Sequence, residues 1–159
     1  MYACARDLFD AARTAATECE RTRRMLLAME AAEQGGRASL DSKIARGSIS
    51  DPMRRVDARI DREAAWRVRI EENESLMDYA TCVLYGSEQD GKGGIAVLLG
   101  TAYADALWWY YLGHETWERT GEIVGYSKSR CKSMRDVAFD LVDALGLAAT
   151  ICGEGMATN

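Results

Sequence analysis

The chain has 159 residues and a formal net charge of −5, with 48% hydrophobic and 28% charged residues. This length allows one or two small domains with a modest core. The acidic balance excludes a general nucleic-acid coating protein, so any contact with DNA must be confined to a small basic surface. The sequence has a single proline and few β-branched residues, and this composition favours an all-α fold.

The cysteines and the single histidine give no sign of a metal site or a catalytic site. Five cysteines are widely spaced and form no C-x-x-C pair: Cys4, Cys19, Cys82, Cys131 and Cys152. This pattern predicts neither a disulfide framework nor a zinc site, and it favours a reducing, cytoplasmic compartment. The first fifteen residues lack the apolar run of a signal peptide. His114 has no partner group beside it, so we expect no enzyme activity, no metal and no cofactor.

The first long helical pattern covers residues 1–33. Small and apolar side chains recur on it in strict four-three alternation: Met1, Ala5, Leu8, Ala12, Ala15, Cys19, Thr22, Leu26 and Met29. This heptad spacing is typical of a coiled coil, and the alternative is a plain amphipathic helix on a core. The unbroken alternation favours a coiled-coil partner and is in keeping with a homodimer.

A second long helix follows a loop and predicts a helical hairpin over residues 1–85. Residues 35–51 are rich in Gly and Ser and predict a flexible loop, after which Asp51 and Pro52 begin a helix that runs to about Tyr85. Two long helices joined in this way most simply fold back on each other as an antiparallel pair. The closed end would gather six arginines: Arg21, Arg23, Arg24, Arg54, Arg55 and Arg59. A solvated charged tip is the preferred interpretation, and a contact for DNA or RNA polymerase is the alternative.

Residues 86–94 are glycine-rich and predict a hinge. Their sequence is close to the phosphate-binding loop motif G-x-x-x-x-G-K-[ST], but Gly93 occupies the position at which that motif requires Ser or Thr. A nucleotide hydrolase is therefore disfavoured.

The following apolar run, residues 95–112, has Asp105 as its only charge. A carboxylate in mid-membrane costs about 2.5–3.5 kcal/mol, so we expect a buried helix and no membrane span.

The helix predicted over residues 95–112 would be the first of three in a domain covering residues 95–146. Six of its side chains are expected to face the other two helices: Leu98, Leu99, Ala102, Ala106, Trp109 and Leu112. Three aromatic residues are then expected to be partly exposed: Trp108, Tyr110 and Tyr111. Residues 147–159 are expected to form a tail.

Two helical patterns, residues 117–124 and 128–145, lie on either side of a short turn. Thr116 can cap the first helix and Ser127 the second, because each hydroxyl can accept a bond from a first-turn N–H. Gly125 suits the left-handed conformation that ends a helix. A short helix, a glycine turn and a longer capped helix together predict a helix-turn-helix.

The longer helix carries four cations and no anion between Lys128 and Arg135. At about 100° per residue, one face is apolar: Cys131, Met134, Ala138, Leu141 and Leu145. The opposite face is predicted to contact base edges through Ser129, Lys132 and Ser133. Lys128, Arg130 and Arg135 are predicted to hold phosphates, and Thr116 with the first-turn amides of its helix to contact the DNA backbone. Asp136 lies near this side, either beyond the groove edge or accepting from a cytosine amino group.

Residues 116–138, T-W-E-R-T-G-E-I-V-G-Y-S-K-S-R-C-K-S-M-R-D-V-A, resemble the region 4 helix-turn-helix of sigma factors. The resemblance is closest to the version carried by small phage and prophage transcription regulators. The positions that fit the pattern are Thr116, Trp117, Glu118, Glu122, Gly125, Tyr126, Ser127, Lys128, Ser129 and Ala138. Thr120 and Gly121 stand where the pattern has an apolar residue and an alanine. The chain has no second sigma-type region, so it is not a complete sigma factor.

The resemblance implies a sequence-specific transcriptional regulator that binds double-stranded DNA, with RNA polymerase as a further candidate partner. Dimerisation would extend the DNA site, because a single helix-turn-helix contacts few base pairs. Two other hypotheses stay open. One is a phage DNA-packaging recognition subunit of the small-terminase type, which also joins a helix-turn-helix to a coiled coil. The other is a helical adaptor that binds proteins and has lost DNA binding.

Overall fold

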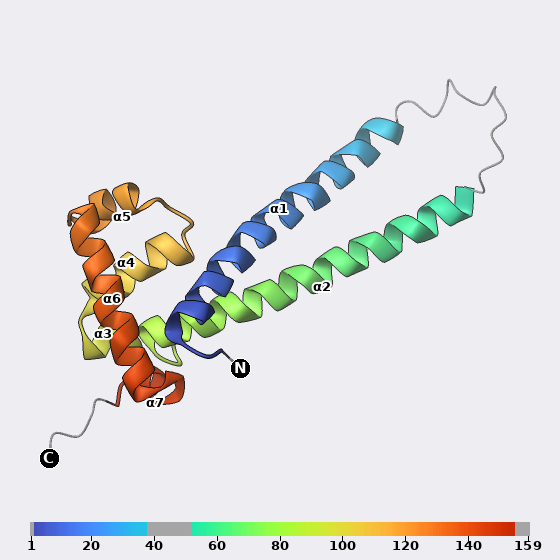
Figure 1. Ribbon diagram of the computed structural model, residues 1–159. Helices are drawn as coiled ribbons and strands as arrows, with labels where there is room; N and C mark the ends of the chain where they lie inside the picture. Colours follow the sequence, from blue (N-terminus) through green and yellow to red (C-terminus); the bar gives the residue numbers. More distant parts are fainter. Residues whose placement is uncertain (1, 38–51, 155–159) are drawn as a thin grey trace, which may run out of the picture. The chain divides into compact units, whose positions relative to one another are not determined.

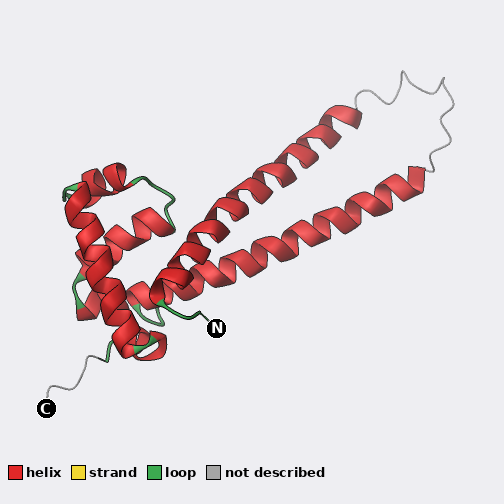
Figure 2. Ribbon diagram, viewed as in Figure 1, coloured by secondary structure: helices red, strands yellow, loops and turns green. Residues whose placement is uncertain are grey.

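The computed structural model describes residues 2–37 and 52–154, and every regular element in these residues is an α-helix (Figures 1 and 2). The predicted all-α fold class is confirmed. The helices of this part of the chain are α1 (Ala5–Arg37), α2 (Pro52–Tyr85), α3 (Gly94–Leu98), α4 (Thr101–Tyr111), α5 (Trp117–Val124), α6 (Lys128–Leu145) and α7 (Leu147–Cys152). None of these helices is both long enough and apolar enough to cross a membrane. The predicted loop at residues 35–51 falls mostly outside the described residues, and α1 continues to Arg37.

The chain divides into two compact units, and the division differs from the predicted one. Unit 1 comprises residues 1–17 and 73–159, and unit 2 comprises residues 18–72. The predicted boundaries placed residues 1–85 in a hairpin and 95–146 in a separate domain. Unit 1 is larger than that domain because the first turns of α1 and the last turns of α2 bury apolar side chains in the same core as the shorter helices.

Buried side chains from each of the helices α1 to α6 form the core of unit 1 around three aromatic rings. The Phe9 ring of α1 lies with its centroid 5.4 Å from that of Tyr111 in α4 and 5.4 Å from that of Phe139 in α6. Val83 of α2 and Ile95 of α3 are fully buried in the same cluster. Burial of one such side chain stabilises a fold by about 1.5–3 kcal/mol, so the first turns of α1 are a structural part of unit 1.

The prediction of a single helix over residues 95–112 is wrong. The chain forms the short α3, breaks at Leu99 and Gly100, and restarts as α4, with Gly100 at φ 105°. Tyr111, predicted to be partly exposed, is buried because the rings of α1 and α6 pack on it. The sequence could not show this contact, because Phe9 lies about a hundred residues away.

The segments predicted as a hinge and a tail both contribute to unit 1. In the predicted hinge, residues 86–94, the backbone at Gly93 and Gly94 is buried. In the predicted tail, α7 begins directly after α6, with Thr150 buried and Ile151 packed against the core. Gly93, Gly94 and α7 are therefore packed parts of this unit.

Unit 2 consists of residues 18–37 of α1 and 52–72 of α2, which run antiparallel. Glu33 forms an ion pair with Arg59, while Leu26, nearer the start of α1, lines a groove with Ile70, nearer the end of α2. The helical segments therefore pair as the predicted hairpin requires. The predicted cluster of six arginines at the closed end does not form, because this register brings Arg23 beside Arg67 instead.

The heptad face of α1 is covered by the chain itself from Ala5 to Thr22. Ala5, Leu8 and Ala12 belong to the core of unit 1, and Cys19 and Thr22 further along are buried. A heptad face and the inner face of an amphipathic helix have nearly the same periodicity, so the sequence alone could not separate them. No coiled-coil partner is needed to bury these five residues, whereas Leu26 and Met29 of the same face are half-buried.

Candidate nucleic-acid interface

Both predicted helix caps and the glycine turn between α5 and α6 are present. The Thr116 hydroxyl accepts a hydrogen bond from the Arg119 backbone N–H at 3.2 Å, and the Ser127 hydroxyl accepts one from Arg130 N–H at 3.2 Å. Gly125 is left-handed, with φ 78° and ψ 27°. The caps leave both helices with ordered first turns, and the turn brings α5 against the start of α6.

Gly121 allows α5 and α6 to approach closely. A Cβ atom at this position would lie 2.5 Å from the Tyr126 carbonyl oxygen and 3.3 Å from the Lys128 nitrogen, both of them backbone atoms. No side chain fits there without a backbone shift. The departure from the alanine of the sigma pattern therefore matches a closer packing of the two helices.

Thr120 takes the position that is apolar in the sigma pattern. Its side chain is fully buried, and its hydroxyl oxygen has no hydrogen-bond partner. The residue therefore serves as a core side chain at the cost of an unsatisfied hydroxyl.

The first two turns of α6 present most of the predicted DNA-binding residues to solvent. Ser129, Arg130 and Ser133 are exposed, and Lys132 is half-buried. Within the described part of the chain, no ion pair is formed by Arg130 or by Lys132. These two cations are therefore available to a polyanion.

Lys128 is exposed but already has a partner. Its ammonium group forms an ion pair with the Glu118 carboxylate of α5, and this contact lowers the pKa of Glu118. Glu118 matched the family pattern, but its contact with Lys128 was not predicted, because the two residues lie on different helices. Any phosphate that Lys128 binds must compete with this carboxylate.

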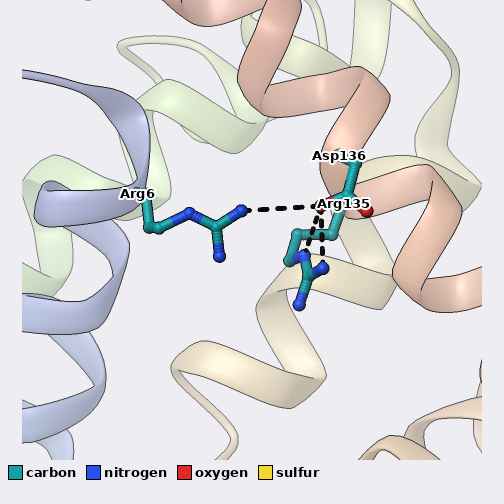
Figure 3. A network of polar contacts seen from close by, with 3 residues as sticks. All are labelled: Arg6, Arg135 and Asp136. Carbon is teal, nitrogen blue, oxygen red and sulfur yellow. Dashed lines mark hydrogen bonds and ion pairs between the residues drawn. The ribbon is translucent and has the colours of Figure 1, made fainter.

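Arg135 does not lie free on the surface as predicted. Its Nε and one Nη lie 2.9 Å and 2.7 Å from Asp136 Oδ1, and its side chain is only 19% exposed (Figure 3). A third residue, Arg6 of α1, lies 3.6 Å from the same oxygen. Arg6 was not among the predicted residues, because no local pattern connects the start of the chain with α6.

A stack of side chains holds the start of α5 in place. The Arg13 guanidinium lies 4.0 Å from the centre of the Tyr110 ring, which stacks on the Trp117 ring with the ring centres 3.7 Å apart. The Arg135 guanidinium lies 5.5 Å from the centre of the Trp117 ring. Arg13 also donates to the backbone carbonyls of Tyr110 and Glu115. The stack joins α1, α4, α5 and α6, so it fixes the helix start at which Thr116 lies.

Other polar groups in unit 1 offer less to a ligand. The Lys92 ammonium lies 2.8 Å from Asp90, so in the loop that resembles a phosphate-binding motif the lysine faces a carboxylate. His114 is exposed and lies 3.3 Å from the Thr17 hydroxyl. Among the described residues, no group of three or more His, Cys, Asp or Glu side chains could hold a metal ion.

No protein-family model, curated protein or solved structure matches the chain. The likeness to sigma region 4 therefore rests on the residues of α5, the turn and α6 themselves. Chemically, this surface offers hydroxyl and cationic donors at the exposed start of a capped helix. Donors of this kind can contact base edges and phosphates.

Proposed function

We propose that the protein is a sequence-specific DNA-binding regulator of transcription that contacts the major groove with the start of α6. The observation that carries this proposal is the exposed, capped start of α6 after the close α5 turn, with Ser129, Arg130 and Ser133 facing solvent. A helix end of this width and chemistry suits the major groove of B-form DNA. The net charge of −5 on the whole chain would confine DNA to this surface.

The residues of the surface would have different roles. Ser129, Lys132 and Ser133 would contact base edges, because their donors lie on the outward side of α6. Arg130 would be the main phosphate contact, since no carboxylate holds it, and Lys128 would contribute once it leaves Glu118. The first-turn amides after Thr116 would bind a backbone phosphate at the start of α5.

The wider setting comes from the resemblance to small phage and prophage regulators. It supports a cytoplasmic protein that acts on double-stranded DNA, as a homodimer and with RNA polymerase as a further candidate partner. A dimer would place two copies of α6 on two half-sites, about one helical turn of DNA apart.

The proposal is tested by titrating duplex fragments selected from random DNA, with fluorescence anisotropy at several salt concentrations. The slope of log K against log salt should fall by about 0.9 when Arg130→Ala removes one phosphate contact. Arg62→Ala is the matched control, because it removes an equally exposed arginine from unit 2. Absence of binding above the non-specific level, or equal slopes for Arg130→Ala and the wild type, would contradict the proposal.

A second candidate function is a protein-binding adaptor without DNA binding. It is favoured by the carboxylates that hold Lys128 and Arg135, and by exposed apolar side chains in unit 2 such as Val56 and Ile60. The same titration separates the two functions. An adaptor would show no duplex binding, and Ile60→Ser would weaken its capture of a protein partner.

A further inference from the structure

Two arginines from different helices converge on one carboxylate oxygen in unit 1. Arg135 approaches Asp136 Oδ1 with two nitrogens, at 2.9 Å and 2.7 Å, and Arg6 of α1 lies 3.6 Å from the same atom (Figure 3). Two cations surround one anion, so the group keeps a net charge of +1. Each guanidinium also retains N–H donors beyond those that Asp136 uses.

Both guanidinium groups lie near aromatic rings. Arg135 lies 5.5 Å from the Trp117 ring centre and Arg6 lies 5.6 Å from the Phe139 ring centre. An arginine beside an aromatic face loses less freedom when it binds an oxyanion, because its planar fork is already oriented. Solvent reaches the group, since the side chains of Arg6 and Asp136 are 54% and 51% exposed.

The position of the group connects it with α6. Asp136 lies less than one turn beyond Ser133 on this helix, and Arg6 lies on the first turn of α1. The backbone N–H of Ala5 is bound to the Asp143 carboxylate of α6 at 2.6 Å, so the start of α1 is anchored beside this helix. A DNA strand that follows α6 would therefore meet a cation from outside the helix-turn-helix.

We propose that Arg6 and Arg135 form a binding site for one backbone phosphate of duplex DNA, and that the Asp136 carboxylate occupies this site in the free protein. The proposal rests on the proposed function and adds a contact made by α1. A phosphate brings one negative charge and can accept from both guanidinium forks, as a carboxylate does. Asp136 then sets the affinity by competing with DNA, and it is not a base-contacting residue.

The experiment compares the salt dependence of duplex binding for Arg6→Gln, Arg6→Lys and Asp136→Asn with that of the wild type. Arg6→Gln should lower the slope of log K against log salt by about 0.9, and Arg6→Lys should leave it nearly unchanged. Asp136→Asn should tighten binding about two- to fivefold, the equivalent of losing one competing surface ion pair. Circular dichroism should show the same helix content in all three variants, because all the substituted side chains are exposed.

Asp140→Asn is the matched control for charge. It removes an exposed carboxylate one turn further along α6, so a gain equal to that of Asp136→Asn would overturn the proposal. The gain from Asp136→Asn should also shrink in an Arg6→Gln background, because the two residues share one site. An unchanged slope for Arg6→Gln would likewise overturn it.

The Arg130→Ala variant, measured in the same series, separates this inference from the proposed function. If Arg130→Ala lowers the slope and Arg6→Gln does not, DNA binding stands and the site at Arg6 is overturned. If the wild type binds no duplex, both are overturned.

Discussion

The two units of the protein bury their apolar residues to different extents. Unit 1 has a core of enclosed large side chains, and Phe9, Ile95 and Leu107 are fully buried in it. In unit 2 several are open to solvent, among them Leu27 at 64%, Ile60 at 58% and Val56 at 50% exposure. Two helical segments can cover only one face of each other, whereas unit 1 encloses its core with segments from seven helices. Most of the stability of the protein should therefore come from unit 1.

The largest expected effect comes from removing a ring at the centre of unit 1. Phe9→Ala should lower the free energy of unfolding by about 3–5 kcal/mol, because the ring packs on both Tyr111 and Phe139. Urea unfolding followed by circular dichroism measures this loss. Val68→Ala in unit 2 is the control, and its 54% exposed side chain should change stability by no more than about 0.5 kcal/mol. Similar losses of unfolding free energy in both variants would contradict the expectation that unit 1 contributes most of the stability.

The next effect compares two helical glycines. Gly121→Ala should destabilise unit 1 by about 1–3 kcal/mol, because the new methyl group would meet the Tyr126 carbonyl oxygen at 2.5 Å. A Cβ atom at Gly35 in α1 would meet no atom of the described residues within 4 Å, so Gly35→Ala should instead stabilise the helix, by up to about 1 kcal/mol. Opposite shifts in the thermal midpoint are expected. A stabilising Gly121→Ala would mean that α5 and α6 are not so closely packed.

A smaller effect is expected at two threonines of the helix-turn-helix. Thr120→Val should stabilise the protein by about 1 kcal/mol, because it removes a buried hydroxyl that has no partner while keeping the shape of the side chain. Thr116→Ala should cost about 1 kcal/mol, because that hydroxyl caps α5. Both changes are measured by thermal unfolding. A loss of stability in Thr120→Val would show that the hydroxyl has a partner in solution.

The last effect expected is a loss of stability at high pH that comes from unit 1. Burial raises the pKa of Tyr111 to about 12, and burial with the hydrogen bond to Asp105 raises the pKa of Tyr85 above its ordinary value. Both phenols ionise near pH 10 in the unfolded chain, so their contribution is complete below that pH and declines as the pH rises above 10. Tyr111→Phe should show a shallower decline in the free energy of unfolding. Residues 18–72 contain no tyrosine, so a decline of equal steepness in this variant would point to other groups.

Much of the helix-turn-helix could be predicted from the sequence, because short-range patterns determine it. Thr116, Gly125 and Ser127 act on groups within four residues of themselves, and the structure places each as predicted. The inward face of α6 was identified only in its first half, where Cys131, Met134 and Ala138 are buried. Further along, Phe139 and Val142 are buried, whereas the predicted Leu141 and Leu145 are half-buried. In the correctly predicted cases the interacting atoms belong to one helix or one turn, so the spacing of residues along the chain is enough to predict the contact.

The remaining features depend on contacts between distant parts of the chain. The face of α1 was assigned to a coiled coil, because alanine-rich heptads suit a partner helix and a domain core equally well. Tyr111 was placed outside because Phe9 was not expected to reach it. The pairing of Arg6 with Asp136 joins residues 130 positions apart, and no local pattern could indicate it.

The lack of a side chain at Gly121 has a consequence for any excised piece of this protein. Glycine is a weak helix former, and α5 has only eight residues, so α5 alone would not hold its shape in water. The conformation of α5 depends on the Tyr110 ring, which stacks on Trp117 of α5, and on the Arg13 guanidinium, which packs on Tyr110. A synthetic peptide covering α5 and α6 should therefore lose the shorter helix, and transplanting these thirty or so residues into another scaffold would not preserve the arrangement of α5 against α6.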